Sequence, residues 1–203
     1  MAAPPYTLPL TLEDYLALPE DNDREREIIR GRLFVAPRSF HAHQIVLLEL
    51  ARLLMRYVLR RGGQRAQLAL EVDLLIDALG TYVSPDLMYF PLGAVPVLLE
   101  LQRRNRRIHV SVVRPDLVVE VLAPGGEARD LEEKRRDYAE AGIPHYWAFD
   151  PQERAMHEFV LDPARGAYEH LTHRRASARP RLFADQRPPF TLSLTRLWPE
   201  RPA

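Results

Sequence analysis

The sequence predicts an α/β fold in which helices flank a mixed central β-sheet. Predicted strands outnumber predicted helices along the 203-residue chain, and the two types follow one another in mixed order. Residues 113–122, Val-Arg-Pro-Asp-Leu-Val-Val-Glu-Val-Leu, are apolar on both faces except at Arg114, Asp116 and Glu120. A strand that is apolar on both faces is typical of the buried centre of a sheet.

Length and composition indicate one domain. A chain of 203 residues can bury a substantial core, and we expect a single domain over 1–203. Its core is expected over about 11–161 and a C-terminal extension over about 162–203. Cysteine is absent and the formal net charge is zero. These facts exclude disulfides, thiol catalysis and cysteine-bound metals, and they leave no overall field to attract nucleic acid.

The sequence also predicts a cytoplasmic location and no membrane partner. No stretch approaches the roughly 20 consecutive apolar residues of a membrane-spanning helix. The N-terminal segment has neither the basic region nor the apolar region of a secretory signal.

The N-terminal elements follow from capping and turn signals. A helix is predicted over 11–18, because Thr11 is a typical N-cap and Asp14 stands at the third helical position of a capping box. Residues 27–36 predict a hairpin that turns at Arg30-Gly31.

Four further elements are predicted before the central strand. A long helix over 40–61 is indicated by near-helical apolar spacing and ends at Gly62-Gly63. One strand is expected over 66–76. A second over 84–90 would pair with it after a turn near 78–80. Residues 91–108 predict a loop or a short helix.

The remaining elements follow the central strand. A charged helix is predicted over 127–141, since Gly142 and Pro144 come directly after it. Strands over 145–150 and 155–161 predict a hairpin, whose apolar strands could form a dimer surface. A further strand is expected over 167–173.

Glu120 is the first candidate functional residue. A carboxylate flanked by three valines and a leucine should not be buried without a partner, because removing a charge from water is costly. The residue types leave three interpretations open: a metal ligand, an ion pair with an arginine, or a protonated acid or general base.

Two aspartates could share an ion with Glu120. Asp116 lies on the same strand face, with its Cα about 13 Å away at 3.3 Å per residue, so we interpret it as a strand-entry residue. Asp86 converges with Glu120 if their two strands lie side by side. The alternative for Asp86 is a turn or bulge aspartate after Pro85.

Lys134 is unusual because it is the single lysine among 28 basic residues. Asp130 lies four residues before it and Tyr138 four residues after it, so all three share one helix face. One interpretation is a surface ion pair of little energetic value. The other is functional, since an ammonium is a compact charge that an arginine does not replace.

These residues belong to a pattern that resembles a known family. The run RPDLVVEVLAPGGEARDLEEKRRDYAEAGIPHYWAFD, the segment REIIRGRLFVAP followed by His43-Gln44, and VSPDLMYF occur in the family's order. On these motifs the chain resembles the Uma-two family of restriction endonucleases, within the PD-(D/E)XK nuclease superfamily. The match covers about 11–161. It implies a restriction-endonuclease-like fold.

The resemblance also implies the site residues. The first acidic residue of the motif falls at Asp86 and the second at Glu120, and Glu27 matches the acidic residue of the N-terminal block. The superfamily's lysine normally follows the second carboxylate by two residues, where this chain has Leu122. Lys134 on the next helix is then the candidate for that role.

The reaction implied is metal-assisted hydrolysis of DNA phosphodiester bonds. Asp86, Glu120 and the Val121 carbonyl would hold Mg²⁺ or Mn²⁺, and Glu27 would support or complete the site. The ion would lower the pKa of a bound water and neutralise charge on the phosphate, with Lys134 as the residue that orients that water. His43, Asp130 and Tyr138 are possible accessory residues, and the interpretation of His43 as a helix-start residue without a catalytic role stays open.

Contact with DNA must come from local charge. Arg103, Arg104, Arg106 and Arg107 form one cluster that could bind phosphates, and residues 60, 61 and 65 form another; a solvated surface is the alternative for each. A homodimer or higher homo-oligomer is expected, because two sites would suit a double-strand cutter.

Two other functions stay open at the level of sequence. The first is a nuclease fold that has lost catalysis and acts as a DNA-binding or partner-binding module. The second is a structural or assembly protein whose acidic residues only pair with arginines. Metal affinity would separate both from the enzyme.

Overall fold

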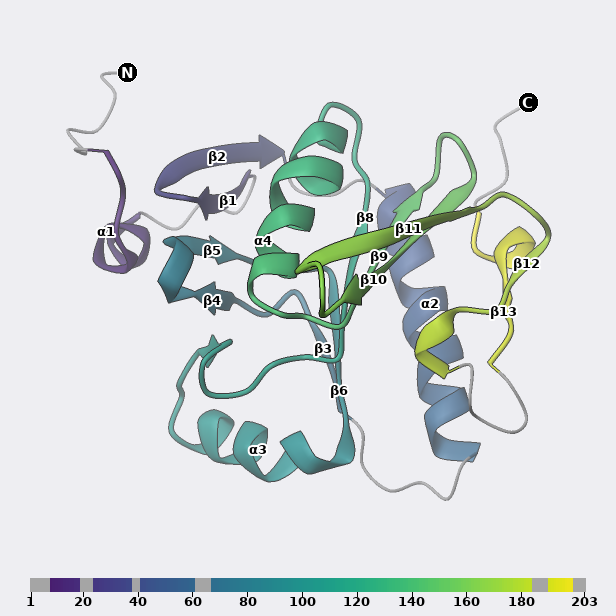
Figure 1. The fold of residues 1–203 in the computed structure, drawn as a ribbon, viewed down its shortest axis with the longest axis horizontal. Coiled ribbons are helices and arrows are strands. Elements are labelled where there is room, and N and C mark those ends of the chain that lie inside the picture. The colour runs from purple at the N-terminus through teal and green to yellow at the C-terminus, as the bar shows by residue number, and fades with distance from the viewer. Residues whose placement is uncertain (1–7, 19–23, 38–40, 61–66, 184–189, 199–203) are drawn as a thin grey trace.

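The structure is a computed structural model that describes residues 8–18, 24–37, 41–60, 67–183 and 190–198 (Figure 1). The α-helices are α1 (Leu12–Ala17), α2 (His41–Arg60), α3 (Val95–Arg103) and α4 (Arg135–Glu140). A π-helical turn, η3 (Arg129–Lys134), leads into α4. The short 3₁₀ turns are η1 (Asp77–Leu79), η2 (Leu92–Ala94), η4 (Arg181–Phe183) and η5 (Leu194–Arg196). The strands are β1 (Arg24–Ile29), β2 (Arg32–Pro37), β3 (Gln67–Leu70), β4 (Leu74–Ile76), β5 (Thr81–Val83), β6 (Leu87–Phe90), β7 (Ile108–His109), β8 (Leu117–Val121), β9 (His145–Asp150), β10 (Ala155–Asp162), β11 (Ala167–His173), β12 (Ser177–Ala178) and β13 (Leu192–Ser193).

The mixed, helix-flanked sheet architecture that the sequence predicts is present, and it is divided into two large sheets and a small one. A six-stranded sheet has the order β11-β10-β9-β8-β6-β3, and a five-stranded sheet has the order β2-β1-β5-β4-β7. Strands β12 and β13 pair separately. The β8–β9 and β4–β7 pairs are parallel and the other pairs are antiparallel, so both large sheets are mixed.

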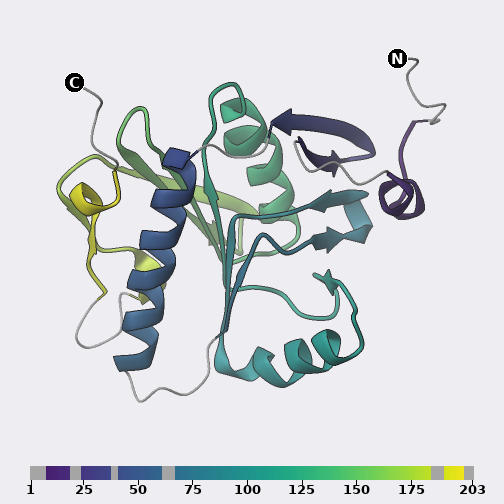
Figure 2. The same cartoon turned by 180° about the vertical axis from the view of Figure 1, so that it is seen from behind.

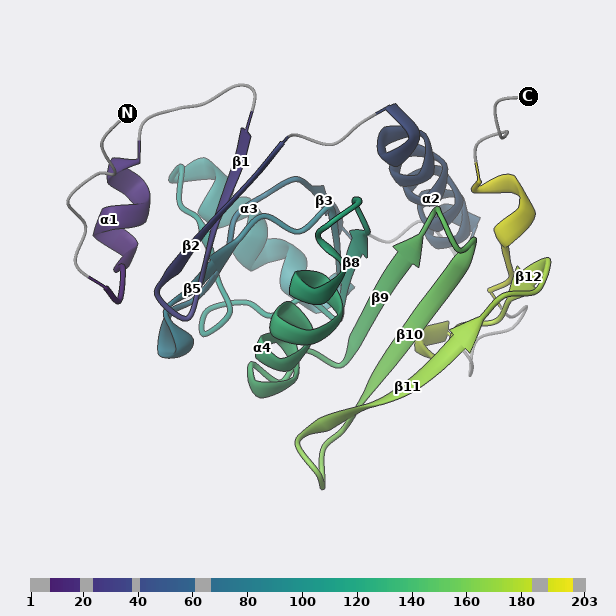
Figure 3. The ribbon, with the colours of Figure 1, turned by 90° about the horizontal axis from the view of Figure 1, so that it is seen from above.

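The two faces of the six-stranded sheet are covered by different elements. Helix α2 and the C-terminal residues around Leu192 and Leu194 pack on the face that carries Val119 and Trp147. On the other face, Tyr138 of α4 and Leu74 of the five-stranded sheet belong to the core cluster that includes Val118 and Tyr146. Figures 2 and 3 show α2 and α4 on opposite sides of the strands.

Several local predictions are confirmed. Thr11 and Asp14 form the reciprocal capping box of α1. The β1–β2 hairpin turns at Arg30-Gly31, where φ is 50° and 74°. The positive φ favours glycine at position 31, and so does the space around it, because a Cβ atom would lie 2.2 Å from the Pro9 side chain. All five residues of β8 are buried, as expected for a central strand.

The predicted strand over 66–76 is wrong in one respect, because it forms two strands in different sheets. Strand β3 pairs with β6 in the six-stranded sheet, whereas β4 turns through η1 into β5. The chain breaks at Glu71, which has a φ of 50°. A positive φ is uncommon for a residue other than glycine, and the apolar pattern gives no sign of it.

The predicted hairpin over 145–161 forms, but its strands lie inside the sheet. Strand β9 lies between β8 and β10, and β10 lies between β9 and β11. Trp147 and Tyr146 are both fully buried, on opposite faces of β9. The apolar faces of this hairpin are therefore covered within the chain.

Two sequence predictions concern residues outside the described part. The stop of the long helix at Gly62-Gly63 and the arginines at 61 and 65 both fall there. Among the described helices, none has the length and apolar character needed to cross a membrane.

Candidate active site

Asp86 and Glu120 lie on neighbouring strands, as the sequence predicts. The antiparallel register of β6 and β8 pairs Leu87 with Val119 and Met88 with Val118. Continuing that register by one residue places Asp86 opposite Glu120. Both residues are buried, at 8% and 4% exposure. The two carboxylates therefore share the end of the strand pair that faces η3.

Lys134 joins three carboxylates in the interior. Its Nζ atom lies 2.7 Å from Oε1 of Glu27, 3.0 Å from Oε1 of Glu120 and 3.3 Å from Oδ1 of Asp130. The lysine side chain is only 3% exposed. The π-helical turn carries both Asp130 and Lys134 on its buried side. The surface ion pair considered for Asp130 and Lys134 is therefore wrong.

Two donors hold Asp86. Its Oδ2 atom accepts a hydrogen bond from the backbone N–H of Val121 at 2.6 Å and lies 3.0 Å from Nε2 of His43. His43 is in the first turn of α2, so this contact connects α2 to the strand pair. Burial disfavours the protonated form of His43, but the hydrogen bond and charge of Asp86 outweigh it and raise the pKa of the imidazole.

Glu27, on strand β1 of the five-stranded sheet, also contacts this cluster. Besides the lysine contact, its Oε1 accepts a long hydrogen bond of 3.3 Å from the backbone N–H of Ser84. Its Oε2 is buried without a hydrogen-bond partner, although Nε of Arg129 lies 3.5 Å away. The side chain as a whole is 1% exposed. Glu27 therefore takes part in a buried ion pair with Lys134.

Two tyrosines donate hydrogen bonds to residues of this cluster. The hydroxyl of Tyr138 donates a hydrogen bond of 2.8 Å to Oε1 of Glu120, and that of Tyr146 donates one of 3.1 Å to the backbone carbonyl of Asp130. Their rings are in edge-to-face contact, with centroids 5.2 Å apart. Tyr138 therefore contacts Glu120 directly, and its accessory role stays a prediction.

The charged groups of the site shift one another's pKa values. Burial raises the pKa of Glu120 well above its ordinary value; Lys134 lowers it, and Asp86, Asp130 and Glu27 raise it further. Burial alone would lower the pKa of Lys134, but the surrounding carboxylates outweigh it and hold that pKa well above its usual range. Lys134 is therefore an ammonium ion at neutral pH.

Carboxyl groups outnumber lysine and arginine side chains in this cluster. Its buried carboxylates are those of Glu27, Asp86, Glu120 and Asp130, and its cations are Lys134 and Arg129. Over the described ranges, however, no three acidic or histidine side chains are grouped tightly enough to hold a metal ion by themselves. A bound cation would need ligands from the backbone or from water as well.

The position at which the resemblance would place a lysine is apolar. Leu122 is buried at 5% exposure and belongs to the core cluster on the α4 side of the sheet. Lys134 reaches Glu120 from the helix instead. The ammonium beside Glu120 is therefore supplied by a helical turn and not by the strand that carries Glu120.

Sequence reasoning missed two residues near the site. Arg129 contacts Glu27 and Asp130. Glu25 lies two residues before Glu27 on β1, on the same side of the strand. Burial and the charge of Glu27 raise the pKa of Glu25 to about 7. The two-residue spacing in Arg-Glu-Arg-Glu was the available signal for Glu25.

The arginine cluster is not brought together with these residues. Arg103 and Arg104 both pair with Glu100 on α3, and Arg107 pairs with Asp73. Figures 1 and 2 show α3 at the opposite end of the molecule from the loop between β8 and α4. Its suggested role in DNA contact stays a prediction.

The mixed sheets, their flanking helices and the carboxylate–lysine cluster at adjacent strand ends define the class, a restriction-endonuclease-like fold. The chain belongs to the Uma2 family, described as "Putative restriction endonuclease", whose model matches residues 12–193. Membership in this family supports a nuclease function.

One solved structure agrees with this fold. The chain is similar to a "putative nuclease belonging to DUF820" from Anabaena variabilis ATCC 29413, with a TM-score of 0.70 and 20% sequence identity. The likeness covers 94% of this chain and 98% of that one. Among curated proteins, none matches the chain.

Proposed function

We propose that this protein is a divalent-metal-dependent endodeoxyribonuclease of the PD-(D/E)XK type. The observation that carries the proposal is the buried ammonium of Lys134, 2.7 Å from Glu27 and 3.0 Å from Glu120, beside the strand end that holds Asp86. A family of this description and a nuclease-like fold support the assignment. The catalytic residues proposed are Asp86, Glu120, Lys134 and Glu27.

Mg²⁺ or Mn²⁺ suits the residues in charge and in donor type. The cluster sets four carboxyl groups against one lysine and one arginine, and Oε2 of Glu27 is buried without a hydrogen bond. Asp86 and Glu120 would hold the ion with Oδ1 and Oε2, the oxygens that take no part in the hydrogen bonds described above, together with the Val121 carbonyl. Hard oxygen ligands and retained waters are what Mg²⁺ prefers. When bound, the ion would supply a water of lowered pKa and charge neutralisation at the phosphate.

Lys134 acts as a donor and a charge rather than as a base. Its raised pKa keeps the ammonium protonated at neutral pH. A protonated amine can orient a water molecule and stabilise negative charge that develops on a phosphate, and such preorganised donors contribute strongly in a site of low dielectric. Arginine at this position would be too large and planar to contact all three carboxylates as a compact charge.

Two further residues position the carboxylates. His43 fixes Oδ2 of Asp86, and Tyr138 fixes Oε1 of Glu120. Burial and the charge of Glu120 raise the pKa of Tyr138 well above its usual value, so its hydroxyl remains a donor. Each carboxylate is thereby held in one orientation before metal or DNA binds.

Calorimetric titration with Mn²⁺ tests the metal site. We expect Asp86→Asn and Glu120→Gln to weaken Mn²⁺ binding at least about tenfold, the range seen when supporting groups of metal sites are removed. Lys134→Met should tighten binding, because a competing cation is removed. Glu169→Gln is the matched control, since Glu169 is an exposed carboxylate that pairs with Arg181 on another part of the surface.

Cleavage of supercoiled plasmid with Mg²⁺ or Mn²⁺ tests the reaction. Lys134→Met should lower the rate by about 10²–10³-fold, the typical effect of removing one transition-state donor, while metal binding persists. Wild-type protein that binds no Mn²⁺, either alone or with a short DNA duplex, would contradict the proposal. That result would favour a nuclease-fold module without catalysis.

A further inference from the structure

The outer face of α2 is unusually apolar. Leu48 is 63% exposed, Leu59 57%, Met55 38% and Ile45 37%. The opposite face of the same helix is already buried, through residues such as Leu50 and Leu54. Because the inner face of α2 is already buried, these exposed apolar side chains make the outer face a candidate for packing against another surface.

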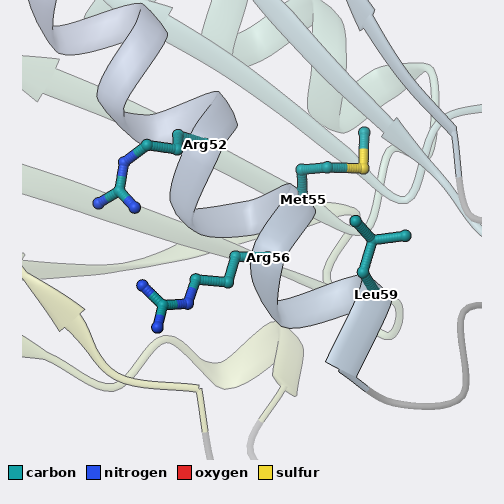
Figure 4. A pocket seen from close by; sticks show the side chains of 4 residues that line it. All are labelled: Arg52, Met55, Arg56 and Leu59. Atoms are coloured by element: carbon teal, nitrogen blue, oxygen red, sulfur yellow. The ribbon is translucent and has the colours of Figure 1, made fainter.

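These side chains follow the spacing of a helix–helix seam. Residues 45, 48, 52, 55 and 59 are separated by alternating steps of three and four, which places them in one line along the helix. Arg52 is the only charged member, and its long aliphatic stem can pack against apolar surface. Figure 4 shows Met55 and Leu59 on one side of a shallow depression and Arg52 and Arg56 on the other.

We propose that α2 of one copy packs antiparallel against α2 of a second copy about a two-fold axis. Along this seam, residues 45, 52 and 59 occupy the first position of a seven-residue repeat and residues 48 and 55 the fourth. In an antiparallel pair of helices, first positions of one helix face fourth positions of the other. The register that centres on this stripe places Leu48 against the partner's Leu59, and Met55 against the stem of the partner's Arg52. Because the axis is two-fold, every contact occurs twice.

Charge complementarity identifies the occupant as a second copy. Glu49 and Arg56 occupy equivalent positions beside the seam, one in each half of the helix. In the same antiparallel register they flank one another across the axis, so two Glu49–Arg56 contacts form. Antiparallel helices also align their macrodipoles favourably.

The size of the stripe predicts a weak dimer. A 20-residue helix is about 30 Å long and 10–12 Å wide, so the stripe covers roughly 300 Å² per copy. That is well below the roughly 800 Å² per partner of a standard stable interface. We therefore expect association that depends on concentration in the micromolar range.

Sedimentation equilibrium from about 5 to 500 µM tests the proposal. Wild-type protein should shift from monomer toward dimer over this range. Leu48→Glu and Leu59→Glu should each weaken association at least tenfold, without loss of helical circular dichroism, since both side chains are exposed in the monomer. Leu171→Glu is the matched control, because Leu171 is 47% exposed on β11 and should leave the dimer unchanged.

A charge exchange tests the antiparallel register itself. Glu49→Arg and Arg56→Glu should each weaken the dimer, and the double variant should restore it to within about threefold of wild type. Glu49 also bonds Arg52 within the helix at 2.5 Å, but that bond is absent from the double variant too, so only restoration is diagnostic. Three results would overturn the proposal: a monomer at every concentration, a dimer insensitive to Leu48→Glu and Leu59→Glu, or a double variant no better than the singles.

Discussion

Lys134 is held in place by charge as well as by packing. A buried ammonium without partners would lose its proton, because burial penalises the charged form. Glu27, Glu120 and Asp130 reverse that preference and raise the pKa. The single lysine of an arginine-rich chain therefore occupies the one position described in the structure where three carboxylates meet an ammonium. A compact cation satisfies all three, and a planar guanidinium does not have that geometry.

Glu25 adds a carboxylate whose charge changes near neutrality. Its pKa is raised to about 7 by burial and by Glu27, with Asp86 adding to the effect and Lys134 opposing it. The negative charge of the site therefore increases as pH rises through that value. Cation affinity is expected to increase in the same direction.

His145, at the start of β9, should make stability depend on pH. Burial lowers its pKa to about 4, whereas the unfolded chain has a value near 6.5. Between those values the unfolded state binds more protons, so stability is present above about pH 6.5 and is lost as pH falls toward 4. Urea unfolding of wild type and His145→Gln from pH 4.5 to 7.5 measures this. The variant should show a shallower slope by up to one proton, and parallel curves would contradict the assignment.

At the scale of elements, the segment formed by η3 and α4 is the part that completes the site. Its π-helical turn places Asp130 and Lys134 inward, and π-helical turns are frequent at functional sites. The segment ends at Gly142, whose φ is 73° and whose amide donates to the Ala139 carbonyl. The way in which α4 packs against the two sheets therefore determines whether Lys134 can contact Glu120.

A buried aspartate fixes α4 to the five-stranded sheet. Asp137 is fully buried and accepts hydrogen bonds of 2.6 Å from Oγ1 of Thr81 and 2.7 Å from Nε of Arg30. We expect Asp137→Ala to lower the free energy of unfolding by about 2 kcal/mol, since it leaves the buried hydroxyl of Thr81 without its acceptor. Glu140→Ala removes a surface partner of the same arginine and should cost less than about 1 kcal/mol. Urea denaturation of both variants measures the difference, and equal losses would contradict this role for Asp137.

At the scale of the whole molecule, the site lies where two sheets and two helices meet. Strand β1 supplies Glu27, the β6–β8 pair supplies Asp86 and Glu120, and the η3–α4 segment supplies Lys134. His43 adds the first turn of α2. Because each group comes from a different element, the site forms only after the two sheets have packed together.

The arginines at 103, 104, 106 and 107 define a second, separate region that DNA binding can test. Each phosphate that the protein no longer neutralises should reduce the salt dependence of binding by about 0.9 in the logarithmic slope. Glu100 and Asp73 already compensate the charges of Arg103, Arg104 and Arg107. We therefore expect replacement of all four arginines by alanine to reduce the slope by less than the full effect of four free cations.

Glu100→Gln is the matched control for that measurement. It releases Arg103 and Arg104 from their ion pairs, so it should make the slope steeper if the region contacts phosphates. Binding of a DNA duplex measured at several salt concentrations gives the slope. An unchanged slope in both variants would remove the region from the DNA interface.

Local signals and residue types are enough to predict much of this molecule before it folds. The capping box at Thr11, the turn at Arg30-Gly31, the buried strand β8 and the β9–β10 hairpin all follow from neighbouring residues. The sequence identifies Asp86 and Glu120 as carboxylates that converge if their strands lie side by side, and the β6–β8 pairing meets that condition.

Long-range packing fixes the features that no local pattern predicts. The break at Glu71, which sends β3 and β4 into different sheets, depends on strand partners far away in the chain. The contact between Glu27 and Lys134 joins residues of a strand and a helical turn, and no sequence spacing measures that distance. The free energy of a buried charge depends on every group around it, and those groups come together only when the chain has folded.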